Sequence, residues 1–463
     1  MYIFIFLSLY IKIINILSEP LVLNFKTRRI NNDENFMKTL INNDIYTYCY
    51  FGEKKQEIEM NIKSQKSSTF VLPKSCPNNI KAKKFDEMNS NSYKVLFKKQ
   101  PYYMYEFKEA TLSADNLLIK QNNNKEIEIK EYNFMLVNAM WDNYQEYMGG
   151  MLGLKLQNKE DLTLPEQSDF INQLKSNNLI NSYVFVLVYN DDYNGNLYIG
   201  DYFHTFNKDY SEKNFMVTKA GYENFKVKNW EINIQKIISG NQNIQNKTYF
   251  QLFYELGIVA APNSYQYYIN HTFFKDYLKN GICKEILNLE NIAGFKKYNY
   301  ISCDKDKFEK SGFPRLKFYN REMDMNFTLS YNELFYEFQN KIYFLIIFPI
   351  YGLNVEYWLM GKPFVKKYKL FLDKDKKIIG LYKNYTEIKE QEQEEKNATN
   401  YTGYIVVIII LVVVLIISII SILYYFLVVK KSRRIRANEL DDNTDYIIHD
   451  GDKEGDKNQF IIN

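Results

Sequence analysis

Few side chains in this sequence could perform catalysis with a familiar motif. The His residues His204, His271 and His449 are too few and too scattered for a zinc site, and no His-Glu-x-x-His occurs. The chain has no Gly-x-Ser-x-Gly nucleophile elbow and no glycine-rich phosphate loop, so a serine hydrolase and a nucleotide-binding protein both lack a starting residue. We therefore expect neither a metal site nor a cofactor.

The cysteines and the glycosylation sequons both point to an exported chain. Cys283 and Cys303 bracket a short segment and are the predicted disulfide, which leaves Cys49 and Cys76 as a candidate second pair. Four cysteines allow three connectivities, so this pairing is a hypothesis. Asn-x-Thr sequons, which predict N-glycosylation, begin at Asn246, Asn270, Asn326, Asn384, Asn397 and Asn400.

An apolar segment without charges runs from Tyr404 to Val429. At about 1.5 Å per residue, a helix of this length exceeds the roughly 30 Å hydrocarbon core of a bilayer. A basic cluster that marks the cytoplasmic side follows it: Lys430, Lys431, Arg433, Arg434 and Arg436. We expect a single transmembrane helix with the N-terminus outside the cytoplasm; the alternative is a buried core helix.

The two ends of the chain fit this topology. Residues 1–18 are apolar with one Lys and predict a cleaved signal peptide, although a retained anchor or a first strand would also fit. Residues 387–403 carry many charges and two sequons, and we expect them to form a stalk outside the cytoplasm. Residues 430–463 form a short polar cytoplasmic tail. The expected location is the cell surface or a membrane of the secretory or endosomal system.

The charge balance argues against a nucleic-acid partner. The formal net charge is +4 over 463 residues, and the Lys residues are scattered among Asp and Glu. The membrane is the partner that the sequence predicts directly.

The region between the ends has the pattern of an all-β protein. Its apolar runs are short, rich in β-branched and aromatic residues, and separated by Asn, Asp, Gly and Ser. Helical spacing is limited to Asp169–Ser176 and Tyr265–Leu278. The expected strands are 45–51, 57–62, 69–72, 102–107, 127–137, 183–189, 196–199, 225–238, 315–319, 342–348, 368–372 and 378–382.

Several short blocks follow one another along this region. They are Tyr50-Phe51-Gly52, the run from Ser67 to Pro73, the run from Gly149 to Leu154, the run from Gly195 to Asp201, and Glu356 to Phe364 with the closing strands. In their order and spacing they resemble the pepsin-like aspartic proteases over about Tyr46 to Tyr385.

This resemblance implies a bilobal all-β fold with pseudo-two-fold symmetry. We expect an N-terminal lobe over residues 44–210 and a C-terminal lobe over residues 211–386. The apolar-Gly elements Leu152-Gly153 and Met360-Gly361 then occupy equivalent places, one in each lobe. Cys283 and Cys303 match the disulfide of the family's C-terminal lobe.

The chain departs from the family at the catalytic positions. Pepsin-like catalysis needs two carboxylates, one from each lobe, that share a proton and hold a water. The family places them in Asp-Thr-Gly or Asp-Ser-Gly loops, and neither tripeptide occurs here. Counting back from the following prolines puts Ser64 and Phe253 at the two acid positions, with Lys66 at a glycine position. Glu255 comes near the second position only after a shift along the chain.

We therefore predict a catalytically inactive pepsin-like module that binds peptide or protein segments in an interlobe cleft. Tyr105, at the family's flap position, is a candidate cleft residue together with Lys66, Tyr254 and Glu255. One alternative is an active membrane-anchored aspartic endopeptidase whose acids lie elsewhere. Another is a structural surface glycoprotein with a closed cleft.

Overall fold

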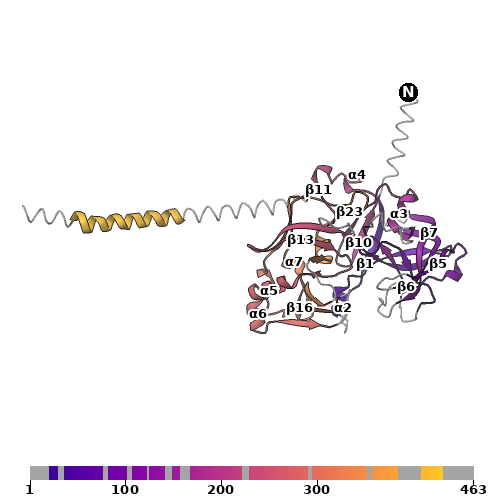
Figure 1. Ribbon diagram of the computed structural model, residues 1–463, viewed down its shortest axis with the longest axis horizontal. Helices are drawn as coiled ribbons and strands as arrows, with labels where there is room; N and C mark the ends of the chain where they lie inside the picture. Colours follow the sequence, from indigo (N-terminus) through magenta and orange to yellow (C-terminus); the bar gives the residue numbers. More distant parts are fainter. Residues whose placement is uncertain are drawn as a thin grey trace, which may run out of the picture. The chain divides into compact units, whose positions relative to one another are not determined.

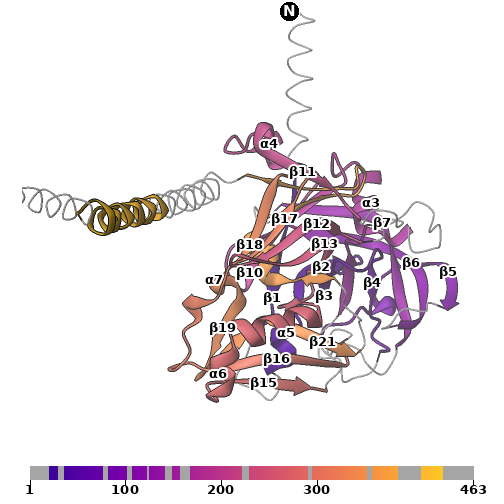
Figure 2. The ribbon, with the colours of Figure 1, turned by 60° about the vertical axis from the view of Figure 1, so that its left-hand side comes forward.

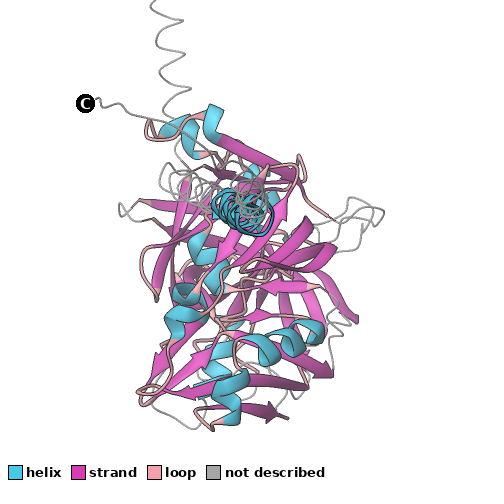
Figure 3. Cartoon of the chain, turned by 90° about the vertical axis from the view of Figure 1, so that its left-hand side faces the viewer, coloured by secondary structure: helices cyan, strands magenta, loops and turns pink. Residues whose placement is uncertain are grey.

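The computed structural model describes eleven stretches of the chain: residues 20–29, 36–76, 82–101, 107–121, 125–140, 149–156, 167–221, 229–289, 295–351, 357–383 and 408–430. The chain divides into two compact units, Met1–Tyr382 and Lys383–Asn463. The first unit is mostly β-structure, with short helices between the strands (Figure 3).

The first sheet of this unit has 13 described strands. Their order is β11 (Phe215–Lys219), β24 (Ile378–Tyr382), β23 (Phe371–Asp373), β9 (Val184–Tyr189), β10 (Asn194–Ile199), β1 (Leu21–Thr27), β2 (Ile45–Phe51), β3 (Gln56–Lys63), β8 (Gly150–Gly153), β4 (Phe70–Val71), β7 (Glu126–Met140), β6 (Phe107–Lys120) and β5 (Lys94–Pro101). Strand β1 pairs with β10 in the middle of the unit (Figure 1), and three strands from the C-terminal half complete the sheet.

The second sheet has 11 described strands, all from the C-terminal half. The order is β18 (Met325–Leu329), β17 (Leu316–Asn320), β12 (Glu231–Ser239), β13 (Gln242–Leu252), β22 (Trp358–Met360), β14 (Val259–Ala260), β21 (Ile346–Tyr351), β16 (Lys297–Asp304), β20 (Lys341–Phe344) and β19 (Phe335–Phe338), with β15 (Cys283–Asn288) beside β16. Figure 2 shows α5 (Asn263–Thr272) beside β21 and α6 (Lys275–Lys279) beside β15 of this sheet.

The two sheets contain the same local pairing pattern. In the first sheet, β8 pairs parallel to β3 and antiparallel to β4, and β4 pairs parallel to β7. In the second sheet, β22 pairs parallel to β13 and antiparallel to β14, and β14 pairs parallel to β21. This repetition is what a fold with two related lobes requires, and it agrees with the predicted positions of Leu152-Gly153 and Met360-Gly361.

Two glycines allow these elements to approach the loops beside them. An ideal Cβ on Gly153 would lie 2.4 Å from the carbonyl oxygen of Lys66. An ideal Cβ on Gly361 would lie 2.2 Å from the carbonyl oxygen of Ile258. Any side chain would therefore push the loop away from the strand, so each glycine fixes the position of the loop that follows β3 or β13.

Most predicted strands are confirmed, and the errors have local causes. The strands Ile45–Phe51 and Ile378–Tyr382 match their predicted bounds. The single strand predicted over 342–348 is wrong. It divides at Leu345, whose N–H donates to Leu334 O (2.7 Å) and whose carbonyl accepts from Val259 N (2.8 Å).

The predicted helix Tyr265–Leu278 is also divided. It forms α5 and α6, because the chain turns at Phe274 to bury that ring completely. Helix α3 (Phe170–Ser176) is confirmed, with Asp169 as its N-cap acceptor from Asn172 N at 2.9 Å. Residues 102–106 and 225–228 of two predicted strands lie outside the described residues.

The helices missed by the sequence patterns are all short. They include α2 (Phe36–Ile41), α4 (Phe203–Phe206), α7 (Tyr331–Leu334) and α8 (Lys362–Lys367). None of these four helices is long enough for two helical turns, so their apolar residues do not repeat at a helical spacing. Pro363 at the first turn of α8 is the local signal that could have revealed it.

One of the two proposed cysteine pairs exists. Cys283 on β15 and Cys303 on β16 lie directly opposite each other and form a disulfide, as predicted. The pairing of Cys49 with Cys76 is wrong, because both are free thiols that are buried in different hydrophobic clusters. Burial raises the pKa of Cys49 to about 12 and that of Cys76 to about 11.

In the second unit, residues 408–424 form an α-helix, and the π-helical turn η5 (Tyr425–Val429) follows it. Residues 404–407 of the predicted anchor lie outside the described residues. Among the helices that the structure describes, none combines the length and the apolar character needed to cross a membrane.

Candidate functional site

The N-terminal side of the candidate site is the loop that follows β3. The last residues of this strand, Met60 to Lys63, are buried, and Ser64 continues this burial with an exposed fraction of 1%. The parallel pairing of β3 with β8 and the close approach of Gly153 to Lys66 hold the loop. Ser64 is therefore fixed inside the molecule rather than displayed on a flexible turn.

The C-terminal side is the loop that follows β13. The N–H of Phe253 donates to Met360 O (2.9 Å), which extends the contact between β13 and β22 by one residue. The chain then turns, and the N–H of Leu256 donates to Phe253 O (3.1 Å). This turn carries Glu255, whose exposed fraction is 7%.

The two loops meet through Ser64 and Glu255. The Ser64 hydroxyl donates to Glu255 Oε2 (2.7 Å), and the backbone N–H of Gln65 donates to Glu255 Oε1 (3.1 Å). In return, the N–H of Tyr254 donates to Ser64 Oγ (3.2 Å). Both carboxylate oxygens and both loop backbones thus belong to one buried hydrogen-bond network.

A pair of glutamines extends this network. Gln65 Nε2 donates to Leu252 O (3.1 Å), and Gln251 Nε2 donates to Gln65 Oε1 (2.8 Å). Sequence reasoning missed these residues as site residues. The signal available was a polar amide directly after Ser64 and another at the end of a buried strand.

Similarity to known proteins agrees with this arrangement. The family model described as eukaryotic aspartyl protease matches residues 46–384. The chain belongs to the eukaryotic aspartyl protease family. No curated protein matches the chain.

Within this aspartyl protease domain, only one of the two residues at the predicted acid positions makes a contact between the loops. Ser64 lies at the junction. Phe253 does not face it, because its backbone stays with β22 and its ring packs, partly buried, against the cluster around Leu256 and Ile258. The side chain that reaches Ser64 is Glu255, two residues further on.

The other candidate cleft residues differ in their burial and in their contacts. Tyr254 is buried, and this burial raises the pKa of its hydroxyl far above the ordinary range. Lys66 is half-buried, and its carbonyl accepts a hydrogen bond from Lys155 N at 2.8 Å. Tyr105 lies outside the described residues. The structure therefore joins Tyr254 and Glu255 to Ser64 and leaves the flap prediction open.

The residue before Ser64 forms an ion pair. Lys63 Nζ lies 3.9 Å from Asp44 Oδ1, and both side chains are mostly buried. Across the described stretches, no group of three or more His, Cys, Asp or Glu side chains is arranged to hold a metal ion.

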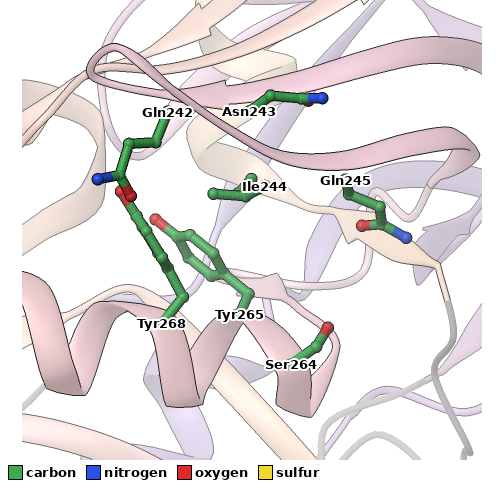
Figure 4. A pocket seen from close by; sticks show the side chains of 7 residues that line it. All are labelled: Gln242, Asn243, Ile244, Gln245, Ser264, Tyr265 and Tyr268. Carbon is green, nitrogen blue, oxygen red and sulfur yellow. The ribbon is translucent and has the colours of Figure 1, made fainter.

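A pocket of about 230 Å³ lies away from the junction, on the second sheet. It is formed by the β12–β13 turn and the first turns of α5 (Figure 4), and its lining residues are Gln242, Asn243, Ile244, Gln245, Ser264, Tyr265 and Tyr268. Figure 4 shows the ring of Tyr268 beside Gln242 and the ring of Tyr265 below Ile244. This hollow is distinct from the Ser64–Glu255 network.

The predicted sequons are divided between described and undescribed residues. Asn246 on β13 is exposed, whereas Asn270 on α5 and Asn326 on β18 are half-buried. The amide nitrogen of Asn270, where a glycan would attach, donates to Glu285 Oε2 at 2.8 Å. Asn384, Asn397 and Asn400 lie outside the described residues.

Proposed function

We propose that this protein is a catalytically silent aspartyl protease homologue that is tethered to a membrane and binds extended peptide or protein segments. The observation that carries the proposal is the hydrogen bond from Ser64 Oγ to Glu255 Oε2 at 2.7 Å. It supports the proposal because this contact between the two loops holds one carboxylate, whereas the family's chemistry needs two.

The chemical reason is the division of roles between the two acids. One carboxylate takes a proton from the attacking water while the other, still protonated, donates to the substrate carbonyl. A serine hydroxyl does not ionise at the pH values at which carboxyl groups titrate. Ser64 therefore cannot exchange the protonated and ionised roles with Glu255. The lone carboxylate accepts one hydrogen bond at each oxygen, from the Ser64 hydroxyl and from the Gln65 N–H, and neither donor is an acid that could share its proton.

The membrane tether is supported by the apolar helix of the second unit. Between residues 408 and 428 its described Ile, Leu and Val side chains are about half exposed or more all around the helix. A helix that is apolar on every face needs an apolar environment. The α-helical residues 408–424 alone are about 25 Å long at 1.5 Å per residue, so the proposed span extends from Tyr404 to Val429.

The proposed topology places the aspartyl protease domain outside the cytoplasm. The disulfide Cys283–Cys303 and the sequons lie before the apolar segment, and the basic cluster from Lys430 to Arg436 lies after it. Alkaline carbonate extraction of membranes and digestion with an N-glycosidase test this part. The expected results are retention in the pellet and a faster-migrating band; release into the supernatant would contradict the tether.

The test of catalytic silence is a cleavage assay. The detergent-solubilised full chain is incubated with denatured protein between pH 3 and pH 6, with pepsin as the positive control. We expect no cleavage. The Glu255→Gln variant is run in parallel, because cleavage that it retains does not depend on the Glu255 carboxylate. Cleavage that is lost in Glu255→Gln and blocked by a transition-state mimic would support an active endopeptidase instead.

A further inference from the structure

The pocket between the β12–β13 turn and α5 is polar but uncharged. None of the described residues that line it carries a charge. A charged ligand would lose water there without gaining an opposite charge. The lining therefore selects a neutral ligand. Around the aliphatic side chain of Ile244 it offers the amides of Gln242, Asn243 and Gln245 and the hydroxyls of Ser264, Tyr265 and Tyr268.

These amides and hydroxyls define the hydrogen bonds that a ligand can make. A primary amide and a hydroxyl each donate and accept hydrogen bonds. Hydroxyl groups on a ligand also do both, so they can pair with the lining in either direction. A compact ligand that carries several hydroxyls therefore matches this pocket better than one that carries only carbonyls or only amines.

The hydroxyl of Tyr265 is the buried polar group of the pocket. Tyr265 has an exposed fraction of 3%, and its hydroxyl makes no hydrogen bond of good geometry although Ser239 lies near it. A buried hydroxyl without a partner costs free energy, which a ligand that pairs with it would recover. Burial also raises the pKa of this hydroxyl, so it stays protonated and able to donate.

Two tyrosine rings give the pocket an apolar wall. Tyr265 and Tyr268 are about one turn apart on α5, and their rings are stacked with a centroid distance of 6.0 Å. Figure 4 shows both rings rising from the helix toward the hairpin that carries Gln242 and Ile244. A sugar ring has hydroxyls at its rim and C–H groups on its faces. It can therefore contact the aromatic rings and the amides at the same time.

The buried Trp358 anchors both walls of the pocket. Its Nε1 donates to Gln245 Oε1 (3.1 Å), and its ring packs against Tyr265 with a centroid distance of 4.9 Å. The volume of about 230 Å³ is below the roughly 300 Å³ at which pockets for drug-sized ligands begin. The pocket thus has room for a single sugar unit and not for an oligosaccharide.

We propose that this pocket binds one neutral sugar unit, with the C–H face of the sugar against the tyrosine rings and its hydroxyls at the amides. The pocket is separate from the Ser64–Glu255 network, so this inference does not depend on the proposed function. The sugar belongs either to another molecule or to the chain's own glycan. The second source is close, because the side-chain amide of the predicted sequon residue Asn246 contacts that of Asn243.

Saturation-transfer NMR tests this binding on the full chain in a detergent without a sugar head group. The probes are glucose, mannose, galactose and N-acetylglucosamine. They are added to the unmodified chain and to Asn246→Gln, which cannot carry a glycan at this sequon. We expect saturable binding of at least one probe. Binding only in Asn246→Gln identifies the chain's own glycan as the occupant, and equal binding in both identifies a sugar of another molecule. No saturable binding in either chain would overturn the inference.

Tyr265→Phe tests the assignment of the pocket, because it removes only the buried hydroxyl. Tyr267→Phe is the matched control, since Tyr267 lies on the same helix but is exposed and outside the lining. We expect the probe to bind about 5-fold more weakly in Tyr265→Phe and with unchanged affinity in Tyr267→Phe. Gln242→Ala, on the exposed side of the pocket, should also weaken binding without disturbing the fold. Affinities unchanged in both Tyr265→Phe and Gln242→Ala would overturn the inference.

The charge of the sugar supplies a last measurement. The probe that binds is compared with its uronic acid, in which a carboxylate replaces the CH₂OH group. We expect the acid to bind at least ~10-fold more weakly, because no cation lines the described pocket to compensate its charge. Equal affinities would show that the sugar binds elsewhere on the chain, which contradicts the inference.

Discussion

The carboxylate of Glu255 and the hydroxyl of Ser64 are 2.7 Å apart, although the two residues are 191 positions apart in the sequence. Both side chains are buried, so each would leave an unsatisfied polar group if its partner were removed. The contact therefore stabilises the junction between the two loops, whatever its role in binding.

Replacing Glu255 should destabilise the folded chain. We expect Glu255→Gln to cost about 1–3 kcal/mol, because its buried partners lose a charged acceptor. Ser64→Ala should cost a similar amount, and the double variant less than the sum of the two single variants. Urea unfolding followed by the fluorescence of the buried Trp230 and Trp358 measures these free energies.

Glu128→Gln is the control for this cycle, because Glu128 is exposed on β7. We expect a change within about 0.5 kcal/mol. Additive effects of Ser64→Ala and Glu255→Gln would show that the two side chains do not interact in solution.

The glycines at the ends of β8 and near β22 should resist substitution. We expect Gly153→Ala and Gly361→Ala each to cost about 2 kcal/mol or more, because the added methyl would meet a backbone carbonyl at 2.4 Å or 2.2 Å. Gly312→Ala is the control, since its nearest neighbour would be Phe273 at 3.7 Å. The same unfolding measurement applies; equal stabilities in all three variants would contradict the close packing of these loops.

Thiol chemistry can check the cysteine assignment. In urea without a reductant, a thiol-specific reagent should react with two cysteines, and with four after reduction. In the folded chain at pH 8 both free thiols should react slowly, because burial raises the pKa of Cys49 to about 12 and that of Cys76 to about 11. No reactive thiol in urea would indicate a second disulfide.

The ammonium group of Lys362 gives a prediction about pH. Burial lowers the pKa of Lys362 to about 8, although Asp192 O accepts a hydrogen bond from Nζ at 2.5 Å. Between pH 8 and the ordinary lysine pKa of about 10.4, the unfolded chain holds the proton more tightly than the folded chain. This group therefore makes stability rise with pH in that window.

Competitive acylation followed by mass spectrometry measures this pKa directly. The labelling midpoint of Lys362 should be near pH 8 in the folded chain and should return to the ordinary value in urea. Lys362→Met should flatten the rise in stability above pH 8. A folded-state midpoint near 10.4 would contradict the burial of this amine.

The sequence determined the family, the positions of about half of the strands and the absence of the family's catalytic motifs. Strand patterns and ordered blocks such as Leu152-Gly153 depend on short-range spacing, which is visible in the chain itself. The absence of Asp-Thr-Gly is likewise visible in the order of the residues. The disulfide Cys283–Cys303 could be proposed from the same blocks, and the structure forms it.

Only the tertiary structure decided which side chains meet. Counting placed Phe253 opposite Ser64, but the backbone of Phe253 stays bonded to Met360 and the turn after it delivers Glu255 instead. The contacts of Ile41 and Asn43 show no pattern in the sequence, because both residues bond to a loop more than 200 residues away. Such contacts depend on how the loops turn between packed strands, which local residue preferences do not specify.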